Sequence, residues 1–140
     1  MKIKNAILFA AFIFMFGYSK GQSNAKWKPL WLSTTNMFKG VEGFYQYVSC
    51  NGTDMVYLKF VNHNNYSIKA GWKDLVITND EQKLYGKIAH DSVTVAPNGE
   101  VAGNCAVPNP QLEIKLSDYG INEANFKSLF ATNFDFVIIH

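Results

Sequence analysis

The chain has 140 residues, of which 48% are hydrophobic and 17% charged, and its formal net charge is +2. This length is sufficient for one hydrophobic core but not for two domains of ordinary size. The chain contains no arginine. Because arginine is the usual reader of phosphate and guanine, we expect no nucleic-acid partner.

Residues 1–21 have the pattern of a secretory signal peptide. Lysines at positions 2 and 4 precede an apolar run of 11 residues, and small residues at Ser19 and Gly21 suit a cleavage site. The run is too short for the roughly 20 residues that span a bilayer as a helix. We predict cleavage after Gly21 and export to the periplasm or the extracellular medium, with no transmembrane anchor after cleavage.

Cleavage changes the charge balance. Residues 1–21 contain three of the 13 lysines, so the remaining chain has ten lysines against eleven acidic residues and a formal net charge of −1. The positive charge of the full chain therefore belongs to the export signal and does not indicate a basic binding surface.

Residues 22–40 show neither strand nor helix periodicity, and we predict an extended N-terminal arm. Its Trp27 and Trp31 either cover one end of the core or form an exposed aromatic pair that contacts carbohydrate or protein. The predicted β domain then comprises residues 41–140.

Residues 41–74 are predicted to form three strands separated by tight turns. The first turn is Asn51-Gly52. An Asn-Gly pair between two β-rich runs is the strongest short hairpin signal, because both residues accept the positive φ of a type I′ turn. In the next two strands alternate residues are apolar, which is typical of half-buried strands. The residues predicted to face the core there are Val56, Leu58, Phe60, Tyr66, Ile68, Ala70 and Trp72.

The rest of the domain consists of short apolar runs separated by turn residues such as Pro97 and Gly99. We predict strands at 83–88, 92–96, 100–105 and 112–116, one or two helical turns within 117–130 capped by Asn122, and a final, central strand at 134–139. Seven or eight short strands without an internal repeat predict a single all-β, antiparallel sandwich.

Cys50 and Cys105 are the two cysteines of the chain. In an oxidising compartment an even pair in a short domain is expected to form one disulfide, and closing a loop of about 55 residues contributes on the order of 4 kcal/mol in the chain-entropy model. The alternatives are two buried free thiols or half of a metal site. Because the spacing matches no zinc motif, we predict the disulfide and no bound metal.

Two groups of residues within 41–116 form a recognisable pattern: Cys50 with Trp72 and Cys105, and Val93, Val95, Pro97 and Gly99 before a returning strand. With this pattern the segment resembles the immunoglobulin-like β-sandwiches of small exported bacterial proteins. The resemblance implies a fold and carries over no functional residue. Gly103 stands where antibody domains have the tyrosine-corner residue, two positions before the second cysteine.

The three histidines, His63, His90 and His140, would have to supply most of a metal or hydrolase site. None of them has the close ligand spacing of a zinc motif. His90 is followed by Asp91 and Ser92, but a triad is recognised by its geometry, and adjacent residues of a strand point to opposite faces. We predict no catalytic residue and no cofactor, with a secreted hydrolase or a small-ligand or carbohydrate-binding protein as the alternative.

The remaining candidate is a contact surface. Tyr45, Tyr47 and Tyr57 are predicted to lie on the face opposite the core residues, where they would form an aromatic stripe with Lys59. Alternatively, cross-strand pairing or the Trp27 arm covers these tyrosines. We expect an exported, non-catalytic binding or envelope accessory module whose partner is an envelope or extracellular protein.

Overall fold

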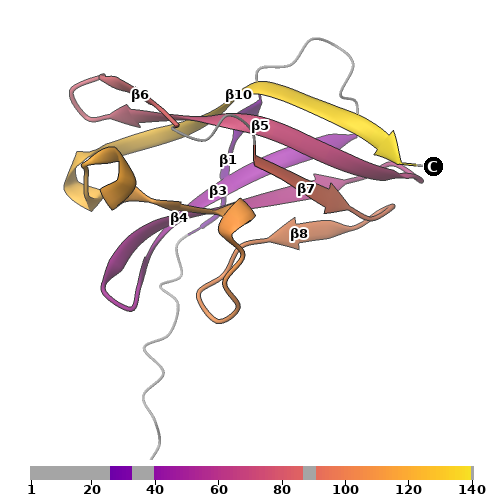
Figure 1. Ribbon diagram of the computed structural model, residues 1–140, viewed down its shortest axis with the longest axis horizontal. Coiled ribbons are helices and arrows are strands. Elements are labelled where there is room, and N and C mark those ends of the chain that lie inside the picture. The colour runs from indigo at the N-terminus through magenta and orange to yellow at the C-terminus, as the bar shows by residue number, and fades with distance from the viewer. Residues whose placement is uncertain (1–25, 33–39, 87–90, 140) are drawn as a thin grey trace, which may run out of the picture.

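The computed structural model describes residues 26–32, 40–86 and 91–139, which form two packed β-sheets (Figure 1). Sheet A contains β1 (Lys28–Pro29), β3 (Val41–Cys50), β4 (Thr53–Asn62), β8 (Glu100–Ala102) and β9 (Glu113–Lys115). Sheet B contains β2 (Trp31–Leu32), β5 (Ser67–Thr78), β6 (Lys83–Tyr85), β7 (Asp91–Val95) and β10 (Phe126–Ile139). The short 3-10 helices are η1 (Pro110–Leu112), η2 (Leu116–Tyr119) and η3 (Glu123–Asn125). The predicted all-β fold of antiparallel sheets is confirmed, with ten described strands where the sequence predicted seven or eight.

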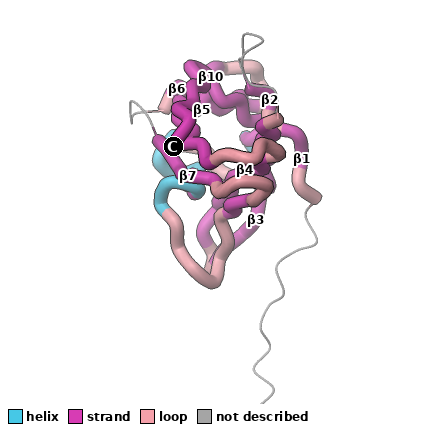
Figure 2. The backbone as a smooth tube through the Cα atoms, turned by 90° about the vertical axis from the view of Figure 1, so that its right-hand side faces the viewer, coloured by secondary structure: helices cyan, strands magenta, loops and turns pink. Residues whose placement is uncertain are grey.

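Each sheet is organised around one long strand. In sheet A, β4 pairs with β3 along one edge and with β8 and β9 along the other. In sheet B, β5 pairs with β10 along one edge and with β6 and β7 along the other. Among the described strands, every pair is antiparallel except β2 with β10. Figure 2 shows the two layers, with β5 and β10 in one and β3 and β4 in the other.

Among the described strands, the chain changes sheet on both sides of β2, between β4 and β5, between β7 and β8 and between β9 and β10. The strand predicted to follow the β3–β4 hairpin, β5, therefore begins the second layer and does not extend the first. The hairpin itself has the predicted turn, because Asn51 and Gly52 have φ values of 51° and 78° and Cys50 is opposite Thr53.

The hydrophobic core lies between the sheets. Phe60 of β4 and Trp72 of β5 are fully buried, and their ring centroids lie 4.6 Å apart. Tyr66, at the crossing between the sheets, is partly buried against the same core. The other residues predicted to face the core are confirmed as buried: Val56, Leu58, Phe60, Ile68, Ala70 and Trp72.

The predicted disulfide between Cys50 and Cys105 is confirmed, with a Cα–Cα distance of 5.7 Å. It connects the end of β3 to the loop after β8, so both ends lie on the sheet A side. The two cysteines pack with Trp27 on a small cluster formed by the outward side chains of β3 and β4. Trp72 instead lies in the main core with Phe60, so the disulfide and this tryptophan belong to different clusters.

The segment 117–130 differs from its prediction. Its helical turns are 3-10 turns, and Asn122 precedes η3 without a side-chain cap bond. Strand β10 begins at Phe126, eight residues before the predicted final strand. Its register shifts twice against β5, between Phe126 and Ser128 and between Thr132 and Asp135. Such bulges break the two-residue period, which concealed the strand in the sequence.

The N-terminal segment contributes one short strand to each sheet. β1 pairs with β3 and β2 pairs with β10, and Leu30 between them is buried in the core. Residues 1–25 lie outside the described residues, and with them the predicted signal peptide and its cleavage site. Among the described residues, none of the helical segments has the length and apolar character needed to cross a bilayer.

Asn62 is fully buried where the chain crosses between the sheets. Its side-chain nitrogen donates to the carbonyl oxygens of Tyr66 and Ala96, at 2.8 and 3.0 Å. Its side-chain oxygen accepts from the backbone nitrogen of Asn64 at 3.0 Å. One amide group thus joins the β4–β5 crossing to the turn between β7 and β8. Because an amide that is buried without partners is costly, full pairing is what makes this residue compatible with the core.

We predict that Asn62→Ala lowers the free energy of unfolding by about 2–4 kcal/mol, because it leaves several buried backbone groups without a partner. The measurement is urea unfolding followed by tryptophan fluorescence. Asn65→Ala, at an exposed position of the same turn, is the matched control and should stay within about 0.5 kcal/mol of the wild type. Equal stabilities for the two variants would contradict the assigned role.

We also predict that replacing Cys50 and Cys105 together by serine lowers the free energy of unfolding by about 2–4 kcal/mol, because the cross-link restricts the unfolded chain. The wild type measured in reductant should match the double variant. Intact mass should rise by two hydrogens on reduction. An unchanged mass would show that the thiols are already free.

Candidate functional site

The structure does not assemble the predicted stripe of Tyr45, Tyr47, Tyr57 and Lys59. Tyr45 and Tyr47 lie opposite Leu58 and Val56 on the inner face of sheet A, and Tyr57 and Lys59 lie on its outer face. The reason is the register that the two-residue turn imposes, because directly opposed residues of an antiparallel pair share a face.

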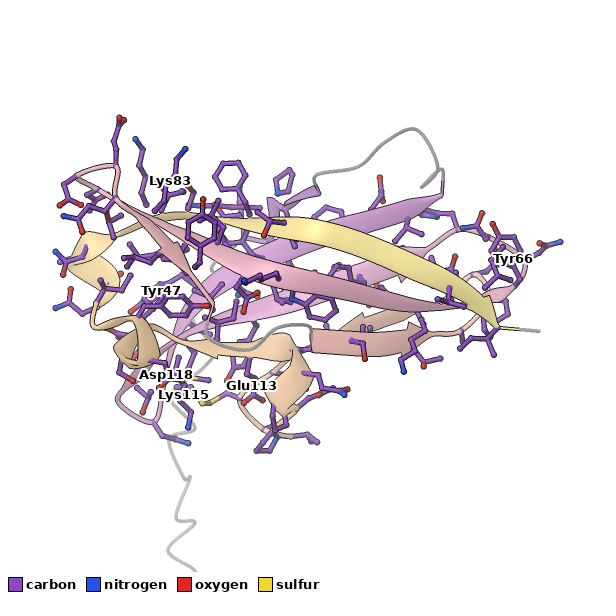
Figure 3. All side chains as sticks on the ribbon, turned by 45° about the horizontal axis from the view of Figure 1, so that its top comes forward. Tyr47, Tyr66, Lys83, Glu113, Lys115 and Asp118 are labelled. Atoms are coloured by element: carbon purple, nitrogen blue, oxygen red, sulfur yellow. A yellow bond between two sulfur atoms is a disulfide. The ribbon has the colours of Figure 1, made fainter. Side chains whose placement is uncertain are left out.

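Tyr45 is a core residue, and only 6% of it is exposed. Phe126 of β10 packs edge-on against its ring at a centroid distance of 6.1 Å. Tyr47 stacks on the same phenylalanine at 6.5 Å. Figure 3 shows Tyr47 among the strands of the sandwich, whereas Lys83 lies at its surface. These two tyrosines therefore join the sheets and do not present a contact surface.

Tyr57 is also buried, in the outer cluster of sheet A with Val48 and Met55. Gly103 lies against it, and a Cβ at this glycine would be 2.8 Å from the Tyr57 ring and 2.5 Å from the Leu112 carbonyl oxygen. The loop that carries the disulfide thus needs glycine there to pass so close to the sheet.

Lys59 covers the same outer face. Its ammonium lies 5.4 Å from the ring centroid of Trp27 and 5.1 Å from that of Phe44, distances at which a cation is attracted to an aromatic face. Glu100 is 3.7 Å away and largely exposed. Lys59 therefore helps to hold Trp27 over the outer cluster, in agreement with the alternative that the arm covers this side of the sheet.

Tyr47 belongs to a polar link at one end of the sandwich. Its hydroxyl donates to Oδ1 of Asp54 at 2.8 Å, and the backbone nitrogen of Glu123 donates to Oδ2 at 3.0 Å. Burial, followed by the hydrogen bond to Asp54, holds the pKa of the Tyr47 phenol well above its ordinary value of 10. A phenol that stays protonated at neutral pH is a poor general base, so this link is structural.

A second carboxylate, Asp74, lies on the inner side of β5. Trp72 donates its indole N–H to Oδ1 of Asp74 at 3.1 Å, and the Tyr119 hydroxyl lies 3.4 Å from Oδ2. These contacts explain how the polar nitrogen of a fully buried tryptophan is satisfied. They also attach η2, which contains Tyr119, to sheet B.

The described part of the chain shows no group of side chains suited to a metal ion. Among the described residues, no three His, Cys, Asp or Glu side chains come together in a group that could hold a metal ion. His63 is exposed, and its Nε2 lies 2.9 Å from Oε2 of Glu42. His90 and His140 lie outside the described residues, as does the side chain of Asp91, so the hydrolase alternative stays a prediction.

Exposed apolar side chains gather on sheet B. Four of the five large apolar side chains found exposed in the described chain belong to its strands, namely Tyr85 at 58%, Val137 at 63%, Ile138 at 39% and Ile139 at 41%. Three of the four are consecutive at the end of β10. In the described part of the chain, β10 pairs on its far edge only with β2, at Phe130 and Ala131. The predicted central strand is confirmed, because β10 lies between β2 and β5, but beyond Ala131 no described strand pairs with it on the β2 side.

A separate apolar row lies on the outer face of sheet B, further along β5 and β10 from residues 137–139. Tyr85, Leu75 and Phe130 form one row across β6, β5 and β10. Lys83 and Lys73 lie on either side of this row. We call the exposed end of β10, Val137–Ile139, together with the positions of β5 beside it, the β10 edge site.

No family model matches the chain, and searches of curated proteins and of solved structures found no significant match. The β10 edge site is therefore assessed on its own geometry.

We predict that stability falls as the pH rises above about 10. Burial raises the pKa of Tyr45, Tyr47 and Tyr57. Because the folded state favours the neutral phenols, the stabilisation is complete below the ordinary pKa and is lost as the pH rises. Urea unfolding at pH 8 and pH 11 measures the loss, which should be smaller in Tyr47→Phe. An equal loss in the two proteins would contradict the raised pKa of Tyr47.

Proposed function

We propose that this protein is an exported, non-catalytic binding module that contacts another protein through the β10 edge site. The observation that carries the proposal is the exposure of Val137, Ile138 and Ile139 on a strand that, at these residues, is paired on one side only within the described chain. Support for export comes from the signal-peptide pattern and from the disulfide, which persists in oxidising compartments.

The chemistry of an edge strand explains why this place is favoured. An edge presents a row of backbone N–H and C=O groups that can pair with a strand from another chain. Most proteins protect such edges with charges, proline or bulges. Here a bulge lies between Thr132 and Asp135, but the three residues at positions 137–139 are apolar. Strand addition there would pair the backbone groups and cover apolar surface at the same time.

Residues on both faces of the sheet would take part. Val137 and Ile139 lie opposite Lys69 and Ser67 on the outer face of sheet B, whereas Ile138 lies opposite the fully buried Ile68 on the inner face. Ile138 is thus an inward residue that is still 39% exposed. An added strand with an apolar residue at the neighbouring inner position would extend the core.

The immunoglobulin-like resemblance stays a prediction beside this proposal. Two packed antiparallel sheets are compatible with it.

Photo-crosslinking tests the proposed function. We expect a photoreactive amino acid at position 137 to give a discrete crosslinked species in the native envelope, whereas the same amino acid at Val107, a 67% exposed loop residue, gives none. The species is then identified and its binding rebuilt from purified components. Equal products from the two positions would contradict a contact at β10.

We predict that Ile138→Lys blocks this binding, because an inward-pointing charge prevents strand addition at an edge. The affinity for the purified partner should fall by tenfold or more while the melting temperature changes little. Val107→Lys is the matched control and should bind as the wild type does. If Ile138→Lys binds normally, the partner does not dock on this edge.

A further inference from the structure

We propose that Asn51 is a site of spontaneous covalent modification, at which the side-chain amide is converted to a succinimide and then to aspartate or isoaspartate. This modification is independent of the proposed function and belongs to the turn between β3 and β4. It is inferred from the different surroundings of the two Asn-Gly pairs of the chain, Asn51-Gly52 and Asn98-Gly99.

The reaction uses the asparagine side chain and the backbone nitrogen of the next residue. This nitrogen loses its proton to water or hydroxide and attacks Cγ of the asparagine. The new carbon–nitrogen bond closes the succinimide ring, and ammonia leaves. Water then opens the ring at either carbonyl, which gives aspartate or isoaspartate. Glycine after the asparagine favours the attack, because a residue without Cβ hinders it least and reaches the widest range of backbone conformations.

The two Asn-Gly pairs are alike in sequence and in exposure. Asn51 and Asn98 are both exposed, and both lie in turns with a positive φ, of 51° and 47°. On these features alone the same reaction is expected at both asparagines. A difference between them must come from the surroundings of the two glycines.

The surroundings of Gly52 are open. Apart from its chain neighbours, a Cβ built at this glycine would meet no heavy atom within 4 Å. Within the described residues, no carbonyl oxygen accepts a hydrogen bond from the backbone nitrogen of Gly52. Water and hydroxide can therefore reach this nitrogen, and its deprotonation breaks no backbone bond of the described chain.

The surroundings of Gly99 are closed. Its backbone nitrogen donates to the carbonyl oxygen of Ala96 at 3.2 Å, and a Cβ built at this glycine would lie 3.2 Å from the same oxygen. The backbone nitrogen of Asn98 donates to the carbonyl oxygen of Asn64 at 2.9 Å, and the Asn62 amide donates to Ala96. Attack on Asn98 therefore requires that bonds of the junction between the sheets be broken.

The attack also requires the asparagine to leave its turn conformation. Opening of a few residues at the end of a hairpin costs less free energy than opening of the strands. Cys50 is paired with Thr53 and bonded to Cys105, so the opening at Asn51 is confined to the two residues of the turn. This position thus combines a free nucleophile with a turn that opens locally.

The two products have different effects on the hairpin. Aspartate tolerates a positive φ, and Asp-Gly is a favoured pair in such turns, so the aspartate form should keep the hairpin. Isoaspartate continues the main chain through its side-chain carbons and lengthens the turn. Because a two-residue turn sets the register of the strands that it joins, we expect the isoaspartate form to have the lower melting temperature.

Ageing of the purified full protein tests the proposal. The protein is incubated at mildly alkaline pH in water enriched in heavy oxygen, which labels the products formed before digestion. Mass spectrometry of the peptides then measures the conversion of amide to acid at each asparagine. We expect Asn51 to react about tenfold faster than Asn98, because one intact backbone hydrogen bond is worth nearly this factor in rate.

The same measurement on the chain unfolded in urea is the control. Both pairs should then react at similar rates, because the protection of Gly99 depends on the fold. Asn62→Ala, which removes one bond of the junction, should speed the reaction at Asn98 and leave Asn51 unchanged. Equal rates at the two asparagines in the folded protein would overturn the proposal. So would a preference for Asn51 that persists unchanged in urea, because the neighbouring residues and not the fold would then cause it.

Discussion

The sandwich depends on how its two sheets are joined at one end, and the side chain of Asn62 makes that junction. The two turns that it joins, 63–66 and 96–99, are two of the places where the chain passes from one sheet to the other. Backbone bonds from Asn62 to Gly99 and from Asn98 to Asn64, at 2.8 and 2.9 Å, complete the junction. A core of apolar side chains is not directional. A fully paired amide fixes the position of one sheet over the other.

Local features of the fold could be predicted because a few adjacent residues determine them. The Asn51-Gly52 turn and the inward positions of β4 and β5 are of this kind, whereas the disulfide could be predicted because the chain contains only two cysteines. The sheet to which β5 belongs could not be predicted in this way, because the turn at 63–66 has the same composition whether the chain stays in one sheet or crosses to the other. The short strands β1 and β2 contain two residues each, too few for any period to appear in the sequence.

The faces of β3 were predicted wrongly for a specific reason. This strand has large apolar or aromatic residues on both of its faces: Tyr45 faces inward and Val48 faces outward. The reason is that sheet A is covered on both sides. Alternation then no longer identifies the core face, and only the pairing register with β4 does. The apolar run at the end of β10 was interpreted correctly as part of a central strand, since β10 lies between β2 and β5. Residues 136–139 alone could not show that, among the described residues, β2 pairs only with Phe130 and Ala131.

The parallel pairing of β2 with β10 has a consequence for the order of folding. These strands are almost a hundred residues apart in the chain, since Trp31 lies opposite Phe130. Contacts of such long range form late and slow the folding of β proteins. During synthesis, β5 remains uncovered on one edge until β10 emerges. A chain that folds only when β10 is present stays unfolded for longer, and an unfolded chain is what the export proposed for this protein would require.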